Sequence, residues 1–128
     1  MNITTMNMDK FYECEGLTDY EKETLLPILI DYLETRRGKE NAVTNSAMRR
    51  LLQILGYSKV GEPRIRKIIN VIRINGYVEC LLANSDGYYS SDDIQEVEEY
   101  IQSLRRREMA IRAVREQIEI QLKKLLVS

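Results

Sequence analysis

A short stretch of the chain carries side chains that could bind nucleic acid. At 100° per residue, Arg66, Lys67 and Asn70 fall on one side of a helix and isoleucines fall on the opposite side. Arginine can pair bidentately with guanine and asparagine with adenine, and lysine and arginine also bind backbone phosphates. The pattern favours contact with double-stranded DNA, although a solvated surface helix can carry the same residues. The residues expected to read base edges or to position the helix on DNA are Arg64, Arg66, Lys67 and Asn70. Those expected to bind backbone phosphates are Arg49, Arg50, Lys59 and Arg73.

Charge is unevenly distributed along the sequence. The 128 residues include 19 Lys and Arg and 20 Asp and Glu, a formal net charge of -1. Residues 36–73 contain ten basic and two acidic side chains, a net charge of +8, whereas the segments before and after them are net -6 and -3. A basic middle between acidic ends indicates a local anion-binding face rather than a protein that coats nucleic acid indiscriminately.

The composition argues against an enzyme. The sequence has no His, and its two cysteines, Cys14 and Cys80, lack the C-x-x-C spacing of zinc or thioredoxin-type sites. We expect no catalytic residue, metal, cofactor or small-molecule substrate, because no nucleophile, base and orienting group can be nominated together. The two cysteines favour a reduced, cytoplasmic protein, and nothing resembles a signal peptide or a membrane span. Cys80 is expected to be a small buried residue in a strand.

Helices and turns can be placed around the basic segment. Thr18 and Glu21 form a capping-box pattern that begins a first helix. Pro27 should kink or divide this helix, and Gly38 should end it with a left-handed cap. The segment 42–44 is long enough only for an edge strand.

Two further helices are expected after that strand. Thr44 or Asn45 should cap a helix over 46–55, and Pro63 should open a helix that ends at Asn75 before Gly76. The residues expected to face the core are Met48, Leu51, Leu52 and Leu55 on the earlier helix, and Ile65, Ile68, Ile69 and Ile72 on the later one.

A hairpin should follow. Residues 77–83 are strand-like, Asp86-Gly87 predicts a two-residue turn, and Tyr88-Tyr89 begins the return strand. The tip has no Lys or Arg, and the minor groove of DNA would repel Asp86. We therefore expect the hairpin mainly to brace the preceding helix, with Tyr88 and Tyr89 packed on the body of the domain.

The sequence ends in a long helix. Ser90 or Ser91 with Asp92 and Asp93 should cap it, and about 35 residues at 1.5 Å each would span about 50 Å. Aliphatic side chains recur at intervals of seven, which is typical of a coiled coil, while Glu108 and Arg115 occupy the second seam, where polar residues fix register and partner. The alternative for residues 94–104 is an amphipathic helix that packs against the domain of the same chain instead of forming a coiled coil. The seam residues expected to form a homodimer are Val97, Ile101, Leu104, Ile111, Ile118, Leu122 and Leu125.

This order of elements is that of a winged helix-turn-helix domain, in which the third helix enters the major groove. The segments that carry a family resemblance are Gly61-Glu62-Pro63-Arg64-Ile65-Arg66-Lys67-Ile68-Ile69-Asn70, Ile72-Arg73-x-Asn75-Gly76, Gly87-Tyr88-Tyr89 and Tyr100-Ile101-Gln102-Ser103-Leu104-Arg105, with Gly38-Lys39-Glu40-Asn41-Ala42-Val43-Thr44 upstream. They resemble small winged-helix proteins of phages, prophages and gut-type bacteria. The resemblance spans roughly residues 17–126 and implies DNA binding in the replication or transcriptional control of mobile elements. Asp86 departs from the Lys or neutral residue expected before the wing glycine.

The sequence thus predicts a mainly α protein with a small β-hairpin (α+β). Its parts are an N-terminal arm over 1–16, a winged-helix domain over 17–91 and a long C-terminal helix over 92–128 for coiled-coil dimerisation. We expect a cytoplasmic homodimer that binds double-stranded DNA as a transcriptional regulator or a replication accessory protein of a mobile element. The alternative is a winged-helix interaction module in a replication or phage assembly that binds proteins and not DNA.

Overall fold

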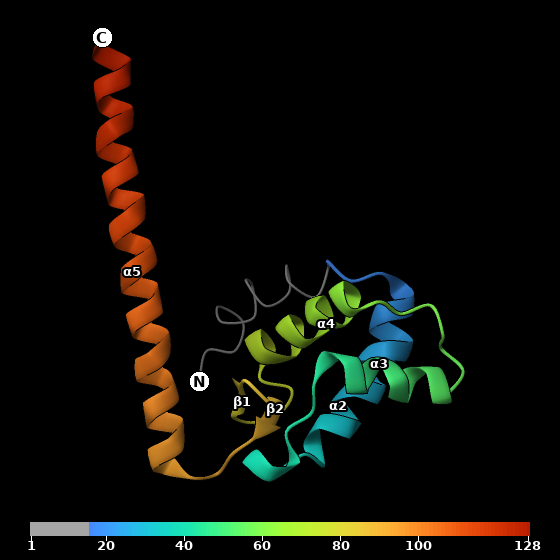
Figure 1. Cartoon of the computed structure of the whole chain (residues 1–128). Helices are drawn as coiled ribbons and strands as arrows, with labels where there is room; N and C mark the ends of the chain where they lie inside the picture. Colours follow the sequence, from blue (N-terminus) through green and yellow to red (C-terminus); the bar gives the residue numbers. More distant parts are fainter. Residues whose placement is uncertain (1–15) are drawn as a thin grey trace, which may run out of the picture. The chain divides into compact units, whose positions relative to one another are not determined.

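The computed structural model describes residues 16–128, and within them the protein is mainly helical, with a two-stranded antiparallel hairpin and a long C-terminal helix (Figure 1). The expected coarse fold class is confirmed. The elements are η1 (Glu21–Leu25), α2 (Leu26–Glu34), η2 (Lys39–Asn41), α3 (Asn45–Ile54), α4 (Glu62–Asn75), β1 (Leu81–Asn84), β2 (Gly87–Ser90) and α5 (Ile94–Val127). The chain divides into two compact units between Asp92 and Asp93. The expected N-terminal arm lies outside the described residues except for Gly16.

The first helical segment begins at the expected capping box. The Glu21 N–H donates to Thr18 Oγ1 at 3.1 Å, and the Thr18 N–H donates to Glu21 Oε1 at 2.8 Å. The disruption expected at Pro27 takes the form of a π-helical turn, η1, that runs directly into α2. The Leu26 N–H bonds the Glu21 carbonyl across this wider turn, just before the proline that has no N–H to donate.

The end of α2 differs from the expectation. The helix stops at Glu34, and Gly38, with φ 86° and ψ 154°, is not a left-handed helical cap. The helix cannot continue because the backbone beyond it pairs with β2: the Gly38 N–H donates to the Ser90 carbonyl at 2.9 Å and the Ser90 N–H to the Arg36 carbonyl at 2.8 Å.

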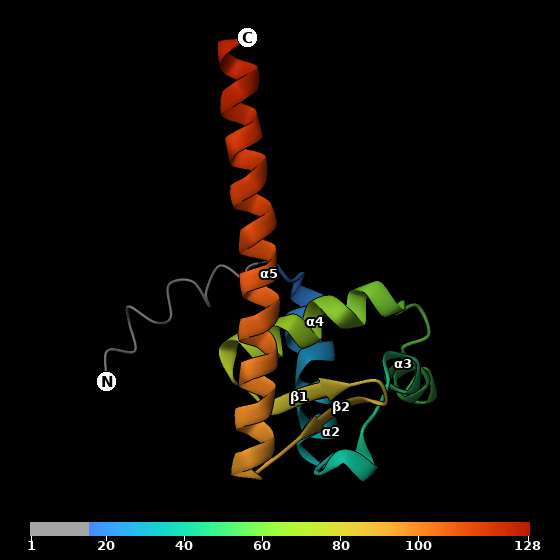
Figure 2. The same cartoon turned by 60° about the vertical axis from the view of Figure 1, so that its left-hand side comes forward.

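The short segment before α3 also pairs with the hairpin. Val43 and Tyr88 exchange both backbone hydrogen bonds, at 2.9 and 2.8 Å, so the expected edge strand is a single antiparallel bridge. A side chain on Gly87 would collide with the Val43 backbone, and this glycine has φ 122°, so the close approach requires Gly. In Figure 2 the hairpin tip accordingly lies beside the start of α3.

Helix α3 begins at Asn45, one residue earlier than expected. Thr44 is its cap, because Thr44 Oγ1 accepts a hydrogen bond from the Ala47 N–H at 3.0 Å. Met48 and Leu52 are buried as expected, but Leu55 is 51% exposed, so its expected core position is wrong. Leu55 lies beyond the last helical turn, where the chain turns away at Gly56 with φ 99°.

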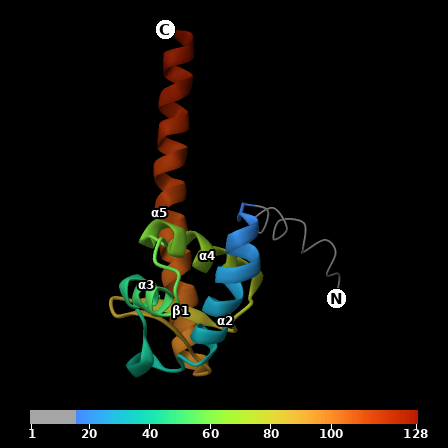
Figure 3. The ribbon, with the colours of Figure 1, turned by 90° about the vertical axis from the view of Figure 1, so that its right-hand side faces the viewer.

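Helix α4 is the centre of the core. Gly76 closes it in the left-handed conformation, as expected, and its N–H bonds the Ile72 carbonyl. Buried side chains of α2 and α3 pack against it, and Figure 3 shows α2 alongside α4. The buried residues of α4 are the four expected isoleucines, Ile65, Ile68, Ile69 and Ile72, together with Val71.

The hairpin is shorter than the sequence pattern indicated. Strand β1 begins only at Leu81, and the two-residue turn is Ser85-Asp86, since Asn84 pairs with Gly87. The strand cannot begin earlier because Cys80 has φ 48°, a left-handed conformation that interrupts extended backbone. Cys80 is also exposed, so the expectation of a buried strand cysteine is wrong.

Helix α5 runs for 34 residues, about 50 Å at 1.5 Å per residue. Asp93 caps it through a bond from the Glu96 N–H to Asp93 Oδ1 at 3.2 Å. Within residues 16–128, no helix combines the length and apolar character needed to cross a membrane.

Candidate nucleic-acid interface

The outer face of α4 presents a polar stripe opposite its buried isoleucines. Arg66, Lys67 and Asn70 are all exposed, as the helical spacing predicted. Among the residues that the structure describes, no hydrogen bond or ion pair engages the side chain of Arg66 or Asn70. These two side chains can therefore meet a ligand without first breaking a contact within the described chain.

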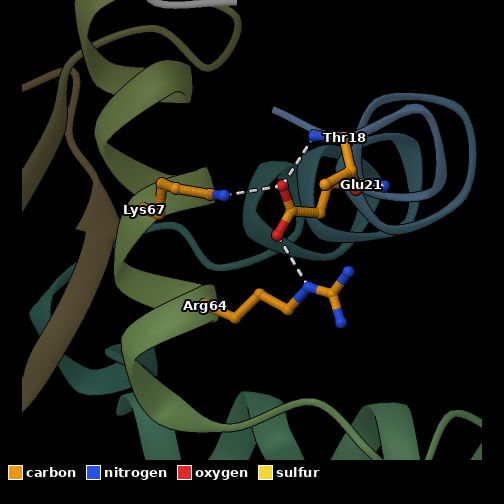
Figure 4. Close-up of polar contacts among 4 residues, drawn as sticks. All are labelled: Thr18, Glu21, Arg64 and Lys67. Atoms are coloured by element: carbon orange, nitrogen blue, oxygen red, sulfur yellow. Dashed lines mark hydrogen bonds and ion pairs between the residues drawn. The ribbon is translucent and has the colours of Figure 1, made fainter. Parts of the chain in front are cut away.

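Two of the predicted cations of α4 are held by an acid from another helical segment. Glu21, whose side chain is 2% exposed, accepts from Arg64 Nε at 2.6 Å and from Lys67 Nζ at 2.8 Å (Figure 4). Its carboxylate also accepts the capping bond from the Thr18 N–H, so one buried group is bound from three sides. The helical segment that begins at Thr18 is thereby fixed against α4.

The surroundings of the Glu21 carboxyl lower its pKa well below the usual value for glutamate. Burial raises its pKa, but hydrogen bonds from Lys67, the Thr18 N–H and Arg64, together with the charge of Lys67, outweigh burial and lower the pKa to about 2. Glu21 is therefore ionised throughout the ordinary pH range, and its charge offsets part of the positive charge of α4.

This site makes a prediction about stability and pH. Because the folded pKa of Glu21 is depressed from 4.5 to about 2, its ionisation contributes stability that is complete above pH 4.5 and is lost as the pH falls toward 2. The size is about 3 kcal/mol, from 1.36 kcal/mol per pKa unit. Glu21→Gln keeps a carbonyl oxygen but removes the charge, so its deficit relative to the native chain should shrink across that window. Urea unfolding at a series of pH values measures the deficit.

The control for that measurement is Glu23→Gln, which removes an exposed acid two residues away on the same helical segment. Its stability should follow that of the native chain at every pH. A Glu21→Gln deficit that stays constant from pH 6 to pH 2 would contradict the ion-pair assignment.

Arg64 and Lys67, although they bind Glu21, are still partly exposed to solvent. The side chains of Arg64 and Lys67 are 33% and 45% exposed. Arg64 uses Nε for Glu21, and Figure 4 shows its two terminal nitrogens pointing away from the carboxylate. The guanidinium carbon also lies 5.2 Å from the centre of the Tyr20 ring. Glu21 and Tyr20 together restrict the orientation of Arg64.

The other predicted phosphate ligands lie on α3, on the loop that follows it and at the end of α4. Arg49 and Arg50 are exposed on α3, and Arg49 Nη1 lies 3.9 Å from Glu62 Oε2 at the start of α4. Lys59 is exposed in the connection, while Arg73 is half-buried in the last turn of α4. The structure thus joins Arg49 to the start of α4 and groups Arg64, Arg66 and Lys67 on α4 itself.

The hairpin offers little to a polyanion. Its tip residues Asn84, Ser85 and Asp86 are exposed, and the Asp86 N–H is bonded to Asn84 Oδ1 at 2.8 Å. Tyr89 is buried and Tyr88 packs against the core, as expected for a hairpin that supports the domain.

The second unit presents an apolar stripe along α5. The predicted seam residues are exposed to different degrees: Ile101 40%, Leu104 42%, Ile111 70%, Ile118 58%, Leu122 52% and Leu125 72%, with Val97 half-buried. An exposed apolar stripe of this length is typical of a surface that another molecule covers. Two ion pairs flank it, Arg112 with Glu116 at 3.6 Å and Arg115 with Glu119 at 2.9 Å.

Sequence reasoning assigned every residue of the α4 face but missed Glu21 as part of it. The capping role of Glu21 was evident from its spacing to Thr18, whereas its contacts with Arg64 and Lys67, 43 and 46 positions away, had no local signal. In the part of the chain described here, no cluster of acidic or cysteine side chains is arranged to hold a metal ion.

Comparison with protein-family models, curated proteins and solved structures gives no match to this chain.

Proposed function

We propose that the protein is a winged helix-turn-helix protein that binds double-stranded DNA through α4 and acts as a homodimer through α5. The observation that carries the proposal is the outer face of α4, where Arg66 and Asn70 are exposed opposite a row of buried isoleucines. Arg and Asn are suited to the major-groove edges of guanine and adenine. The single-residue bridge before α3 and the hairpin after α4 agree with the winged-helix order.

The electrostatic arrangement supports local, oriented binding. Basic side chains of α4, α3 and their connection can position the helix on phosphates, and no side chain caps the N-terminus of α4 at Gly61, which leaves first-turn N–H groups for a phosphate. The acidic hairpin tip makes the hairpin a support rather than a minor-groove reader. The family resemblance favours a regulator or replication accessory protein of a mobile element.

The direct test is a titration with duplex DNA at two or more salt concentrations. A dimer that makes about six phosphate contacts should show a slope of about -5 when the logarithm of the association constant is plotted against the logarithm of the salt concentration. The affinity should fall steeply between low and physiological salt, since counterions compete for the basic face. Absent binding, or binding that does not depend on salt, would contradict the proposal.

One observation favours the second candidate, a module that binds proteins. Ile54 is 83% exposed and Leu55 51% exposed, and they form a small apolar patch at the C-terminal end of α3. If this patch is the functional surface, replacing both residues by Ser should abolish capture of a protein partner while the same chain shows no salt-dependent affinity for DNA.

A further inference from the structure

The charged residues of the α5 seam indicate which way a second copy would lie. In the heptad pattern, Ile94, Ile101, Glu108, Arg115 and Leu122 share one seam position, and Val97, Leu104, Ile111, Ile118 and Leu125 share the other. Glu108 and Arg115 are thus the charged residues inside an otherwise aliphatic seam. A partner must satisfy both, because an unpaired charge in a seam is costly.

A parallel pair of α5 helices would bring like charges together. Residues at the first seam position face their own equivalents in a parallel dimer, so Glu108 would meet Glu108 and Arg115 would meet Arg115. Flanking positions repeat the conflict, since Arg107 would lie against Arg112 of the other copy. Neither charged seam position gains a partner from its equivalent in this orientation.

An antiparallel pair brings opposite charges together. When Ile101 lies opposite Leu125 and Leu104 opposite Leu122 of the other copy, Glu108 comes within one turn of Arg115 in both symmetric halves. In the same register, Arg105 lies beside Glu119 of the other copy, and Arg112 lies beside its own equivalent but is paired with Glu116 of its own helix at 3.6 Å. Arg115 and Glu119 already form an ion pair at 2.9 Å within one helix, so these residues can form a continuous network.

We infer that α5 associates with α5 of a second copy in antiparallel orientation, with Glu108 of each chain paired to Arg115 of the other. The inference rests on the dimer of the proposed function and adds its direction. The two Asp93 residues, where the helices begin, are then about 60 Å apart at 1.5 Å per residue. Two DNA-binding units attached at such distant points fit half-sites about two helical turns apart or two separate duplex segments better than adjacent half-sites.

The test uses the full chain and the doubly reversed variant Glu108→Arg with Arg115→Glu. An antiparallel dimer of the variant restores both pairs, whereas a mixed dimer with the native chain places Glu against Glu and Arg against Arg. The two chains, one carrying a mass tag, are mixed at equal concentration, equilibrated and examined by native mass spectrometry. The heterodimer should be depleted about tenfold relative to random pairing, equivalent to about 1.4 kcal/mol.

Comparison of the heterodimer with both homodimers cancels any effect of the substitutions on the helix itself. An excess of heterodimer would show that the helices pair in parallel, and random pairing would show that the charges do not set the orientation. Either result contradicts this inference but not the proposed dimer. A mass of one chain in every sample would instead contradict the dimer. A matched control replaces Arg106 by Glu and Glu116 by Arg, outside the seam, and should give random pairing with the native chain.

Discussion

Replacement of Arg66 by Glu together with Asn70 by Ala should weaken binding to the tightest duplex from a random-sequence selection by at least about a thousandfold. Each bidentate contact to a base is worth about 1–3 kcal/mol, and a dimer would lose two in each subunit. Both side chains are exposed and make no hydrogen bond or ion pair with other described residues, so their replacement leaves the core intact. Fluorescence anisotropy at one fixed salt concentration measures the change.

The matched control replaces Arg106 by Glu and Gln102 by Ala on α5, which makes the same change in charge outside the unit that contains α4. Its affinity should stay within a few-fold of the native value. Equal losses in both variants would assign the effect to total charge and contradict a specific role for α4. Lys67 is unsuitable for charge reversal, because a carboxylate at that position would face buried Glu21.

Replacement of Ile111 and Ile118 by Lys should convert the proposed dimer into a monomer. Each loss of an isoleucine that the proposed dimer would bury costs about 2 kcal/mol or more, and each substitution acts in both copies, so the dissociation constant should rise by at least about a thousandfold. The helix itself tolerates Lys well. Multi-angle light scattering gives the mass in solution, and circular dichroism verifies that the chain is folded.

Met109→Lys with Ile120→Lys is the control for dimerisation. Both residues are exposed apolar side chains of α5, 68% and 49% respectively, but neither lies on the heptad seam. This variant should keep the mass of a dimer. If the seam variant also keeps it, the chains associate through another surface and the proposed role of the α5 seam is wrong.

The helical elements could be predicted because their signals are local. Thr18 with Glu21, Thr44 with Ala47, and Gly76 after Asn75 act through backbone groups within a few residues, and the structure places each where the spacing indicated. The failure at the end of α2 arises because distant backbone decides the outcome. The end of α2 depends on pairing of its following residues with Ser90, more than fifty positions away.

The candidate site shows the same division. The exposed side of α4 follows from helical periodicity, so Arg66 and Asn70 could be placed from the sequence. The binding of Arg64 and Lys67 to Glu21 depends on how the first helical segment packs against α4, which periodicity does not encode. The strand-like run before Leu81 was not predicted correctly because Cys80 has a left-handed backbone, which periodicity does not encode.

The buried carboxylate of Glu21 has a consequence for the thermodynamics of ion release. In the proposed DNA complex, Arg64 and Lys67 share their positive charge with Glu21, so they neutralise less phosphate charge and displace fewer of the cations condensed on the DNA than two unpaired basic side chains would. The number of phosphates derived from a salt titration should therefore be smaller than the number of basic side chains near the DNA. Glu21 acts as a built-in anion at the edge of the α4 face.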